Sequence, residues 1–387
     1  MISSSLSSFA VLPATSALVI AVNSMRTVRN VTSSWSRIAW VRSSCSRSFN
    51  SLIVAHPLTR RHPSPSMRPE SSVSTAPSDD FGRAPGECGH ARLGAMRLRT
   101  ALATAALAGA AGLAYARWEA QSYRLRRVRV PALPDDHDPV RVLHLSDLHL
   151  TPERAKLQSW VGALAELRPD LVIVTGDIIS DHDAVPVAID ALEPLFDVPG
   201  AFVLGSNDYY APTPINPLKY FAGPSDLDPQ RAELPWRDLI EGLQAAGWAH
   251  LGNAQSSAPL SAGSIALRGV DDPHIERDDY ATVAGATTGV TFGIAHAPYT
   301  RVLDAMAADG VDLILAGHTH GGQVRLPGAG ALVTNCDLDR SRARGLSRHR
   351  DAHLHVSAGL GTSPYAPIRF ACPPEATLIE VIPDSSR

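Results

Sequence analysis

Five apolar segments of this chain each end in a short polar turn, and this feature constrains the possible folds more than any other. The segments 141–146, 170–175, 201–204, 290–295 and 312–316 have the length and the aliphatic composition of buried strands. Their polar turns are Asp147-x-His149, Gly176-Asp177, Ser206-Asn207-Asp208, His296 and Gly317-His318-Thr319-His320. Polar residues that recur directly after buried strands predict a shared site at one edge of a sheet.

Segments with helical spacing of apolar residues alternate with the early strands. These segments are 153–168, 183–196 and 236–247, whereas the later chain adds the strands 264–270, 353–361 and 376–382. Strands that first alternate with helices and then follow one another predict an α/β protein, with layered sheets and helices outside.

The candidate ligands in these turns are two Asp, one Asn and four His within a span of 174 residues, and Asp208 is a third carboxylate beside them. In α/β sheets, ligands bind beyond the carboxyl ends of the strands, so these side chains are expected to converge. Taken singly, each has a plainer explanation, such as a helix N-cap for Asp147 or a turn former for Asp177. Because they recur in order at strand ends, we expect one metal site, and this mixture of oxygen and imidazole donors suits Mn, Fe or Zn.

Four segments of the sequence resemble the calcineurin-like metallophosphoesterase family. They are SDLH (146–149), VTGD (174–177), GHTHGGQ (317–323) and AGLGTSPYAPIRFACPPE (358–375), and the similar region covers about residues 120–383. The likeness is greatest to the bacterial subgroup that carries an N-terminal export or membrane segment. The resemblance implies a four-layer α/β/β/α sandwich and a two-metal hydrolase of phosphoesters.

The resemblance also implies a role for each polar turn. The implied ligands are Asp147, His149 and His320 for a first metal, Asp177 for both metals, and His296, His318 and an amide from the third turn for a second. Two metals about 3.5–4 Å apart can share one carboxylate and hold a bridging hydroxide as the nucleophile.

The third turn departs from the family pattern Gly-Asn-His-Asp/Glu, in which Asn ligates metal and His protonates the leaving oxygen or holds the phosphate. Here the turn reads Gly205-Ser206-Asn207-Asp208. Aligned without a gap, Ser206 takes the place of the ligand, whereas aligned by residue type, Asn207 does. We expect Asn207 to be the ligand, because an amide oxygen is a better donor to a hard cation than a neutral hydroxyl. Asp208 is expected to cap the turn, or else to orient His149 or Asn207.

The missing histidine has a consequence for the substrate. A positioned acid typically contributes about 10²–10⁴-fold to a rate. Without one, bound metals serve best when the leaving group is already good. We therefore expect hydrolysis of a phosphodiester, a diphosphate or an activated ester rather than an alkyl monoester, with Asp177, Asn207 and His149 as the catalytic residues.

Three further residues are candidate contacts for the substrate phosphate. Arg325 and Arg369 have the guanidinium geometry that binds phosphate, although each is equally suited to a buried ion pair. His274 follows the Asp-rich turn after the strand at 264–270, where a structural turn is the plainer explanation. Separately, His144, Cys336 and Cys372 are expected to lie in the core.

The N-terminal part of the chain has a different character. Residues 1–95 are rich in Ser, Arg and Pro and lack sustained periodicity, which predicts a disordered or misassigned extension. Residues 96–118 contain MRLRT and then 16 uncharged residues, which fits an export signal, a short membrane anchor or a helix packed on the domain. A full membrane span needs about 20 residues. The metallophosphoesterase domain is expected over 120–385.

Charge and the N-terminal segments bear on partners and location. Residues 1–95 carry a formal charge of +6 and the remainder −9, and an acidic body argues against non-specific nucleic-acid binding. The basic stretch 117–131 is suited to anionic lipid headgroups at a membrane surface. We expect a membrane-associated or exported protein, or alternatively a cytoplasmic one, that acts on a phosphoester, and no obligate protein partner is evident.

Two other functions are consistent with the sequence. A metal-binding pseudoenzyme or regulatory envelope protein would explain the altered third turn, although the six other metal ligands remain. A soluble nucleotide phosphodiesterase would fit if residues 96–116 are not a membrane element. The remaining six ligands favour the enzyme, and the apolar segment and the subgroup are the basis for expecting a phospholipid-like or nucleotide-diphospho-lipid substrate.

Overall fold

The computed structural model describes residues 87–214, 231–260, 263–326 and 328–385, and all of them belong to one unit, Gly82–Arg387. The predicted N-terminal extension therefore lies almost wholly outside the described residues. The same is true of most of the proline-rich segment between 211 and 235.

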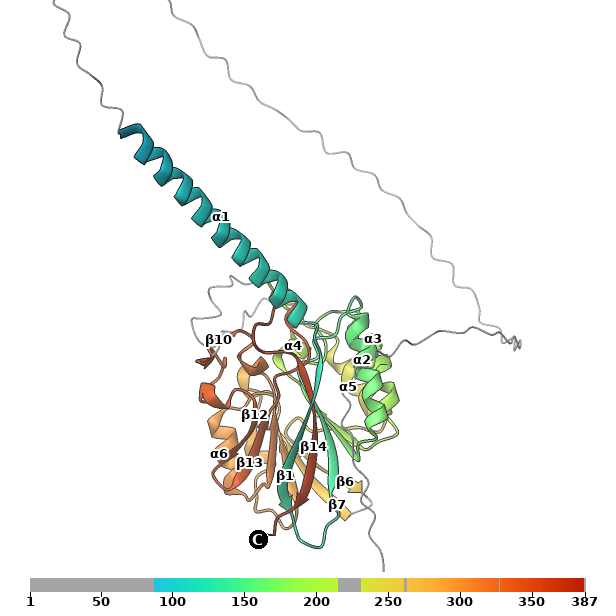
Figure 1. Cartoon of the computed structure of the whole chain (residues 1–387). Coiled ribbons are helices and arrows are strands. Elements are labelled where there is room, and N and C mark those ends of the chain that lie inside the picture. Colours follow the sequence, from blue (N-terminus) through green and yellow to red (C-terminus); the bar gives the residue numbers. More distant parts are fainter. Residues whose placement is uncertain (1–86, 215–230, 261–262, 327, 386–387) are drawn as a thin grey trace, which may run out of the picture. The chain divides into compact units, whose positions relative to one another are not determined.

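Two six-stranded sheets form the body of this unit (Figure 1). The first has the order β1 (Arg124–Leu133), β14 (Glu375–Pro383), β2 (Val140–Leu145), β3 (Leu171–Thr175), β4 (Gly200–Val203) and β5 (Ala249–His250). The second has the order β12 (Gly345–His349), β13 (Ala352–Val356), β9 (Leu313–Ala316), β8 (Thr291–Ile294), β7 (Gly263–Gly269) and β6 (Ala254–Leu260). A short ribbon pairs β10 (Arg325–Leu326) with β11 (Gly330–Ala331).

Helices cover the outer face of each sheet, as Figure 1 shows. The helices on the first sheet are α2 (Ala155–Gly162), α3 (Ala184–Leu192) and α5 (Trp236–Ala245), and α6 (Thr300–Ala308) lies on the second. The order of layers is therefore helix, sheet, sheet, helix. The prediction of a four-layer α/β/β/α sandwich is confirmed.

The alternation of side chains along each strand explains these layers. On β2, Leu143 and Leu145 pack with the helices, whereas Val142 packs between the two sheets. On β9, Leu313 faces the other sheet and Ile314 faces the layer of α6. A strand that is apolar on both faces can only be stable when both faces are covered.

The direction of the strands positions the polar turns. Strands β2, β3 and β4 run parallel to one another, and so do β7, β8 and β9. The carboxyl ends of parallel strands meet at the same edge of a sheet, so the turns that follow these strands are brought together. This is the geometric basis of the convergence that the sequence predicts.

Helix α1 (Glu87–Glu119) is longer than the predicted apolar segment. Among the described residues, one helical stretch, Met96–Glu119, is long and apolar enough by composition to cross a membrane, and it has 24 residues. None of that stretch's most apolar window is buried. The alternative of a helix packed along the domain is therefore wrong for most of Met96–Glu119, in which the buried residues are Ala116 and Glu119 near its end.

Several elements differ from their predicted extents. Residues 124–131 of the basic stretch 117–131 belong to β1, a ten-residue strand parallel to β14 that was not predicted. The segment 353–361 is a strand only to Val356 and then becomes a loop. Helix α6 and strands β6 and β12 were not predicted, since their apolar residues are few or weakly periodic.

Candidate metal centre

Four of the predicted ligands form one tight group. Ligand atoms of Asp147, His149, Asp177 and His320 all lie within 4.8 Å of one another. His149 Nε2 lies 3.5 Å from Asp177 Oδ2, and His320 Nε2 lies 3.5 Å from Asp147 Oδ1. Asp147, His149 and Asp177 are buried, and His320 is half-buried. This group comes from the turns after β2, β3 and β9.

A second group adjoins the first through Asp177. His296 Nε2 lies 3.5 Å from Asp177 Oδ1, and His318 Nδ1 lies 3.3 Å from His296 Nε2. Asp177 thus presents one carboxylate oxygen to His149 and the other to His296. A carboxylate with imidazoles on both of its oxygens has the position expected of a ligand that bridges two cations.

The backbone at these turns adopts an unusual conformation. Five candidate ligands have a positive φ, between 45° and 67°: Asp147, His149, Asp177, His318 and His320. Left-handed backbone at non-glycine residues costs of the order of 1–3 kcal/mol each and persists only where the surrounding structure fixes it. Such strain concentrates at functional sites, and here it coincides with the polar turns.

Two glycines allow the turns to approach one another closely. A Cβ added at Gly205 would lie 2.3 Å from Asp177 Oδ1, and one added at Gly317 would lie 1.8 Å from Ser146 Oγ. Both distances are shorter than any real contact, so larger residues at these positions would push the turns apart. The glycine that precedes each of these motifs is thus required by packing.

Hydrogen bonds outside the group fix the orientation of two histidines. His296 Nδ1 donates to the carbonyl of Thr175 at 2.7 Å, and His318 Nε2 donates to the carbonyl of Asn335 at 3.1 Å. A carbonyl only accepts, so the proton of each neutral ring lies on the outer nitrogen. The inner nitrogens, His296 Nε2 and His318 Nδ1, then have lone pairs directed into the site, as metal ligands require.

Burial and mutual charge set the protonation of the group. Burial lowers the pKa of His149 to about 4, and it lowers the pKa of His318 and His320 well below the ordinary value. Burial also raises the pKa of Asp147 to about 6. Burial by itself lowers the pKa of His296, but the charges of Asp177, Asp272 and Asp147 and the hydrogen bond to Thr175 together outweigh it and raise that pKa to about 9. Ligation by His296 therefore requires a cation to displace the proton from Nε2, because only the neutral ring binds metal.

The third turn brings Asn207 to this group. Asn207 donates to Asp177 twice, from its backbone N–H at 2.9 Å and from its side-chain amide at 2.8 Å. Among the described residues, no hydrogen bond joins the side chain of Ser206 to the group. Asp208 accepts hydrogen bonds from the backbone of Gly205 and Ile178, so it caps the turn as predicted.

Arg231 also reaches the third turn, and the sequence did not single it out. Its Nη2 donates to Asn207 Oδ1 at 3.1 Å and to the carbonyl of Tyr210 at 2.8 Å. The signal in the sequence is the long, proline-rich segment 211–235, to which Arg231 belongs.

The three predicted substrate contacts have different surroundings. The ring centroid of His274 lies 4.5 Å from that of His318, so this histidine borders the site. Arg369 is fully buried and donates to the carbonyls of Gly359 and Gly361, and its Nη2 lies 3.2 Å from His320 Nδ1. Arg325 donates to the carbonyl of Gly321. The guanidinium of Arg369 thus lies beside His320, and the substrate contact that the sequence predicts for Arg369 stays a prediction.

Residues expected in the core are mostly there. His144 is fully buried, and its ring contacts His355 and Thr175. Cys372 is buried and Cys336 is half-buried, and both are free thiols.

Comparison with known proteins identifies the family. Residues 140–322 match the family model of the calcineurin-like phosphoesterases. The chain contains a calcineurin-like phosphoesterase domain. The class of chemistry of such a domain is the hydrolysis of phosphoester bonds, and the predicted recognition and enzyme class are thereby confirmed.

Curated relatives of this phosphoesterase come from bacteria and animals. The Bacillus subtilis "Uncharacterized metallophosphoesterase YkuE" is 26% identical, over 72% of this chain and 92% of its own length. The Escherichia coli "Phosphodiesterase YaeI" is 26% identical, over 74% and 99%. The Danio rerio "Transmembrane protein with metallophosphoesterase domain" is 29% identical, over 53% and 46%.

Proposed function

We propose that this protein is a dinuclear, divalent-metal-dependent phosphoesterase. The main support is the position of Asp177. One of its carboxylate oxygens lies 3.5 Å from His149 Nε2, and the other lies 3.5 Å from His296 Nε2. In this proposal Asp147, His149 and His320 hold one cation, His296 and His318 hold the other, and Asp177 is shared.

The donor set fits such cations. Buried carboxylates and neutral imidazoles whose lone pairs converge are suited to Mn, Fe or Zn, and no thiol takes part. A bound pair of divalent cations supplies Lewis-acid activation of water and neutralises charge on the phosphoryl group. The protein's own contribution is to hold these ligands in a strained and dry setting.

Asn207 and Arg231 bear on the substrate. The side-chain amide of Asn207 donates to Asp177, and Nη2 of Arg231 lies 3.1 Å from Asn207 Oδ1, so this guanidinium adjoins the proposed metal site. A guanidinium attracts phosphate oxygens but does not release its proton near neutral pH. The third turn can therefore bind substrate without protonating a leaving group, which favours a phosphodiester or a diphosphate.

Membrane association is the proposed setting of this activity. The apolar stretch Met96–Glu119 is directly followed by the first strand of the body, β1. An active domain held close to a bilayer is suited to a phosphoester on a lipid, so a lipid-linked substrate is the proposed natural class. The same helix also fits an export segment.

A metal-binding protein without turnover is the second candidate. It is favoured by one observation, the replacement of the histidine of the third turn by Asn207, whose amide nitrogen rather than oxygen faces Asp177. The two candidates differ in whether metal accelerates hydrolysis.

A hydrolysis assay distinguishes them. Purified protein with Mn²⁺ is expected to hydrolyse bis-p-nitrophenyl phosphate, and Asp177→Ala is expected to reduce the rate at least about 10²-fold, because both cations lose a ligand. Asp190→Ala, an exposed acid on α3, is the matched control and should keep the wild-type rate. Metal binding without metal-dependent hydrolysis in the wild type would favour the second candidate.

A further inference from the structure

A polar pocket of about 400 Å³ lies beside the end of α1, away from the candidate ligands. Its charged lining consists of Glu119, Arg124, Arg126, Arg344 and Glu375. None of these residues belongs to the metal centre, so the phosphoesterase site does not account for them.

Three of the five charged residues already have partners. Glu119 accepts from the hydroxyl of Tyr115 at 3.0 Å and from the backbone N–H of Cys372 at 3.2 Å. Arg126 pairs with Glu375 Oε2 at 2.9 Å. These contacts form a rigid wall, since Glu119 and Glu375 are both buried.

The remaining two arginines have no carboxylate partner in the described part of the chain. Arg344 is half-buried, and its recorded polar contact is to the sulfur of Cys372 at 3.7 Å. Arg124 is exposed at the start of β1. Two guanidinium groups in one pocket, each with N–H groups that bond no carboxylate, are suited to bind a phosphate.

Glu375 provides an independent indication of a ligand. Its Oε1 is buried and has no hydrogen-bond partner, and the residue is only 2% exposed. A buried acceptor without a donor is costly, so a donor from a bound molecule would relieve it. The pocket thus offers donors for an anion and one acceptor for a hydrogen-bond donor.

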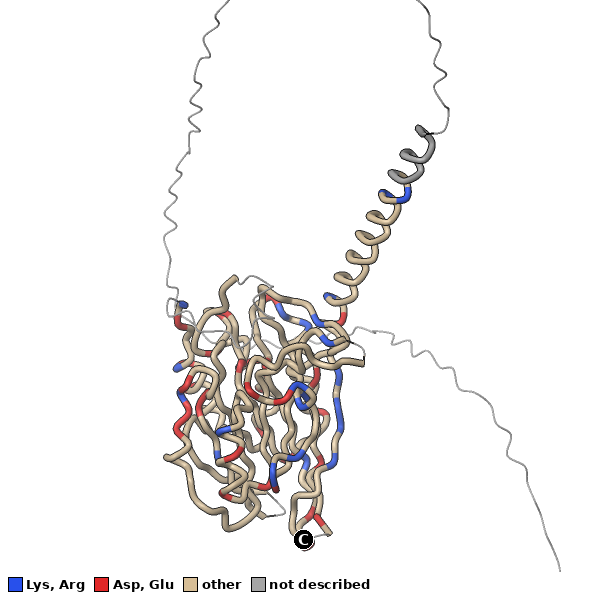
Figure 2. Tube along the Cα trace, turned by 90° about the vertical axis from the view of Figure 1, so that its left-hand side faces the viewer, with Lys and Arg blue, Asp and Glu red and all other residues tan. Residues whose placement is uncertain are grey.

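The position of the pocket at the end of α1 indicates that its ligand is a lipid headgroup. Glu119 is the last residue of the 24-residue apolar stretch of α1. Tyr115 and Trp118, near that end, are 42% and 62% exposed, and Figure 2 shows basic positions along the chain below the helix. Aromatic side chains and arginines at the end of an apolar helix mark the level of lipid headgroups.

We propose that this pocket binds the headgroup of a phospholipid that carries both a phosphate and a hydrogen-bond donor, as phosphatidylethanolamine does. The phosphate contacts Arg344 and Arg124, and the headgroup ammonium donates to Glu375 Oε1. The proposal does not depend on turnover at the metal centre.

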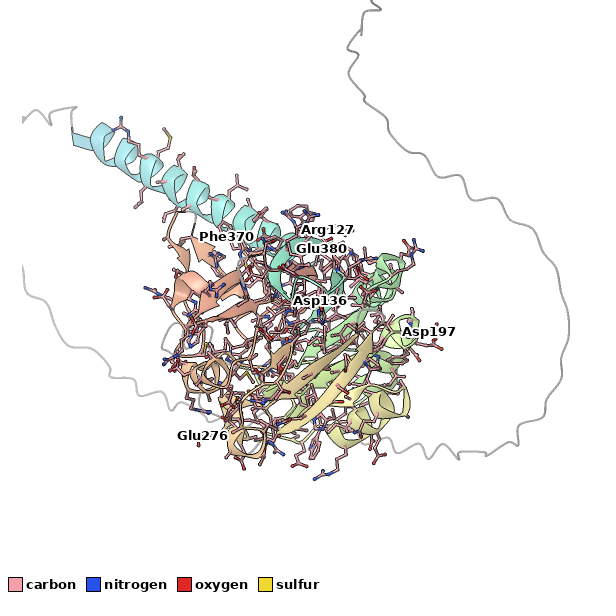
Figure 3. All side chains as sticks on the ribbon, turned by 90° about the horizontal axis from the view of Figure 1, so that it is seen from below. Arg127, Asp136, Asp197, Glu276, Phe370 and Glu380 are labelled. Carbon is pink, nitrogen blue, oxygen red and sulfur yellow. The ribbon has the colours of Figure 1, made fainter. Side chains whose placement is uncertain are left out.

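Binding of soluble, short-chain lipids to the full-length protein in detergent tests this pocket. Dihexanoyl-phosphatidylethanolamine is compared with dihexanoyl-phosphatidylcholine and with inorganic phosphate, and affinity is measured by isothermal titration calorimetry. The variants are Arg344→Gln and Arg124→Gln. The control is Arg127→Gln, an exposed neighbour on β1 outside the pocket (labelled in Figure 3).

The ethanolamine lipid is expected to bind at least about tenfold more tightly than either comparison ligand, because only it satisfies both halves of the pocket. Arg344→Gln and Arg124→Gln should each weaken it about tenfold, and Arg127→Gln should not. Equal binding by the choline lipid, or by phosphate alone, overturns the proposal, as does unchanged binding in both pocket variants. Arg124→Gln, at an exposed site, keeps the test valid if Arg344→Gln fails to fold.

Discussion

Asp177 shows how much depends on one residue. Both of its oxygens accept hydrogen bonds from Asn207, and both also face an imidazole. Burial raises the pKa of Asp177, but His296, His149 and the hydrogen bonds from Asn207 together outweigh it, so the net shift is downward and the carboxylate stays ionised at neutral pH. An ionised carboxylate between imidazoles is suited to bind cations. The neighbouring Asn207 determines whether the site also holds a proton donor for the leaving group.

Restoring a histidine at the third turn tests the role of the missing acid. Asn207→His is expected to raise kcat for phenyl and alkyl phosphodiesters about 10–10²-fold and to leave the p-nitrophenyl ester nearly unchanged, because only poor leaving groups need a proton. Rates are compared across a series of leaving groups at saturating Mn²⁺. Asn207→Gln, which retains an amide, is the matched control, and an unchanged slope across the series in Asn207→His would contradict the argument.

The loop from 357 to 374 is the element that joins the metal centre to α1. Within it, the backbone N–H of Arg369 donates to the carbonyl of Ala116, and its guanidinium contacts His320. Phe370 packs its ring 5.5 Å from that of Tyr115, beside α1 in Figure 3. One loop therefore touches both the last turn of α1 and a candidate metal ligand.

Arg369 is predicted to be a positioning residue for His320. Arg369→Lys retains the charge but loses the planar group that bonds several carbonyls at once, so Mn²⁺ affinity should fall about 10–10²-fold. Affinity is measured by competition with a chelator, and KM for the diester should change far less. Arg348→Lys is the control, because Arg348 also contacts a histidine and a carbonyl but lies outside the site. Equal metal affinity in both variants would show that the loop does not support His320.

The stability of the folded protein depends on the packing of its two sheets against each other. Apolar residues of both sheets form most of that interface, and a buried histidine pair lies within it, His144 on β2 and His355 on β13, whose Nδ1 atoms are 2.9 Å apart. Burial lowers the pKa of His355 to about 3 and that of His144 well below its usual value. Both rings are therefore neutral in the folded protein over a wide pH range.

This histidine pair predicts how stability depends on pH. Each unfolded imidazole has a pKa of about 6.5, so below that pH the unfolded chain binds more protons than the folded one. Stability is thus present above pH 6.5 and is lost as the pH falls towards about 3. At pH 5 the loss is of the order of 2 kcal/mol for each buried histidine.

Replacement of both rings isolates this effect. The double variant His144→Leu, His355→Leu should unfold at a urea concentration similar to wild type at pH 8, and it should lose about 2–4 kcal/mol less than wild type between pH 8 and pH 5. Parallel pH profiles for the two proteins would mean that other groups control acid stability.

The sequence was informative wherever a strong local pattern coincided with a turn. The strands β2, β3, β4, β8 and β9 were predicted within a residue or two, because each is a short aliphatic run bounded by polar residues. The candidate metal ligands that follow these strands were proposed from the same pattern. By contrast, β1 was not predicted, because its arginines alternate with apolar residues and resemble a basic surface segment.

The sequence by itself determined the order of strands and helices, the polar turns and the chemistry of their side chains, since periodicity and residue type are local properties. The tertiary structure alone decided that Asp177 lies between two groups of imidazoles, that Arg231 reaches Asn207, and that Arg369 is buried behind His320. These contacts join residues distant in the chain, and their distances follow from the packing of two sheets, which no local pattern records.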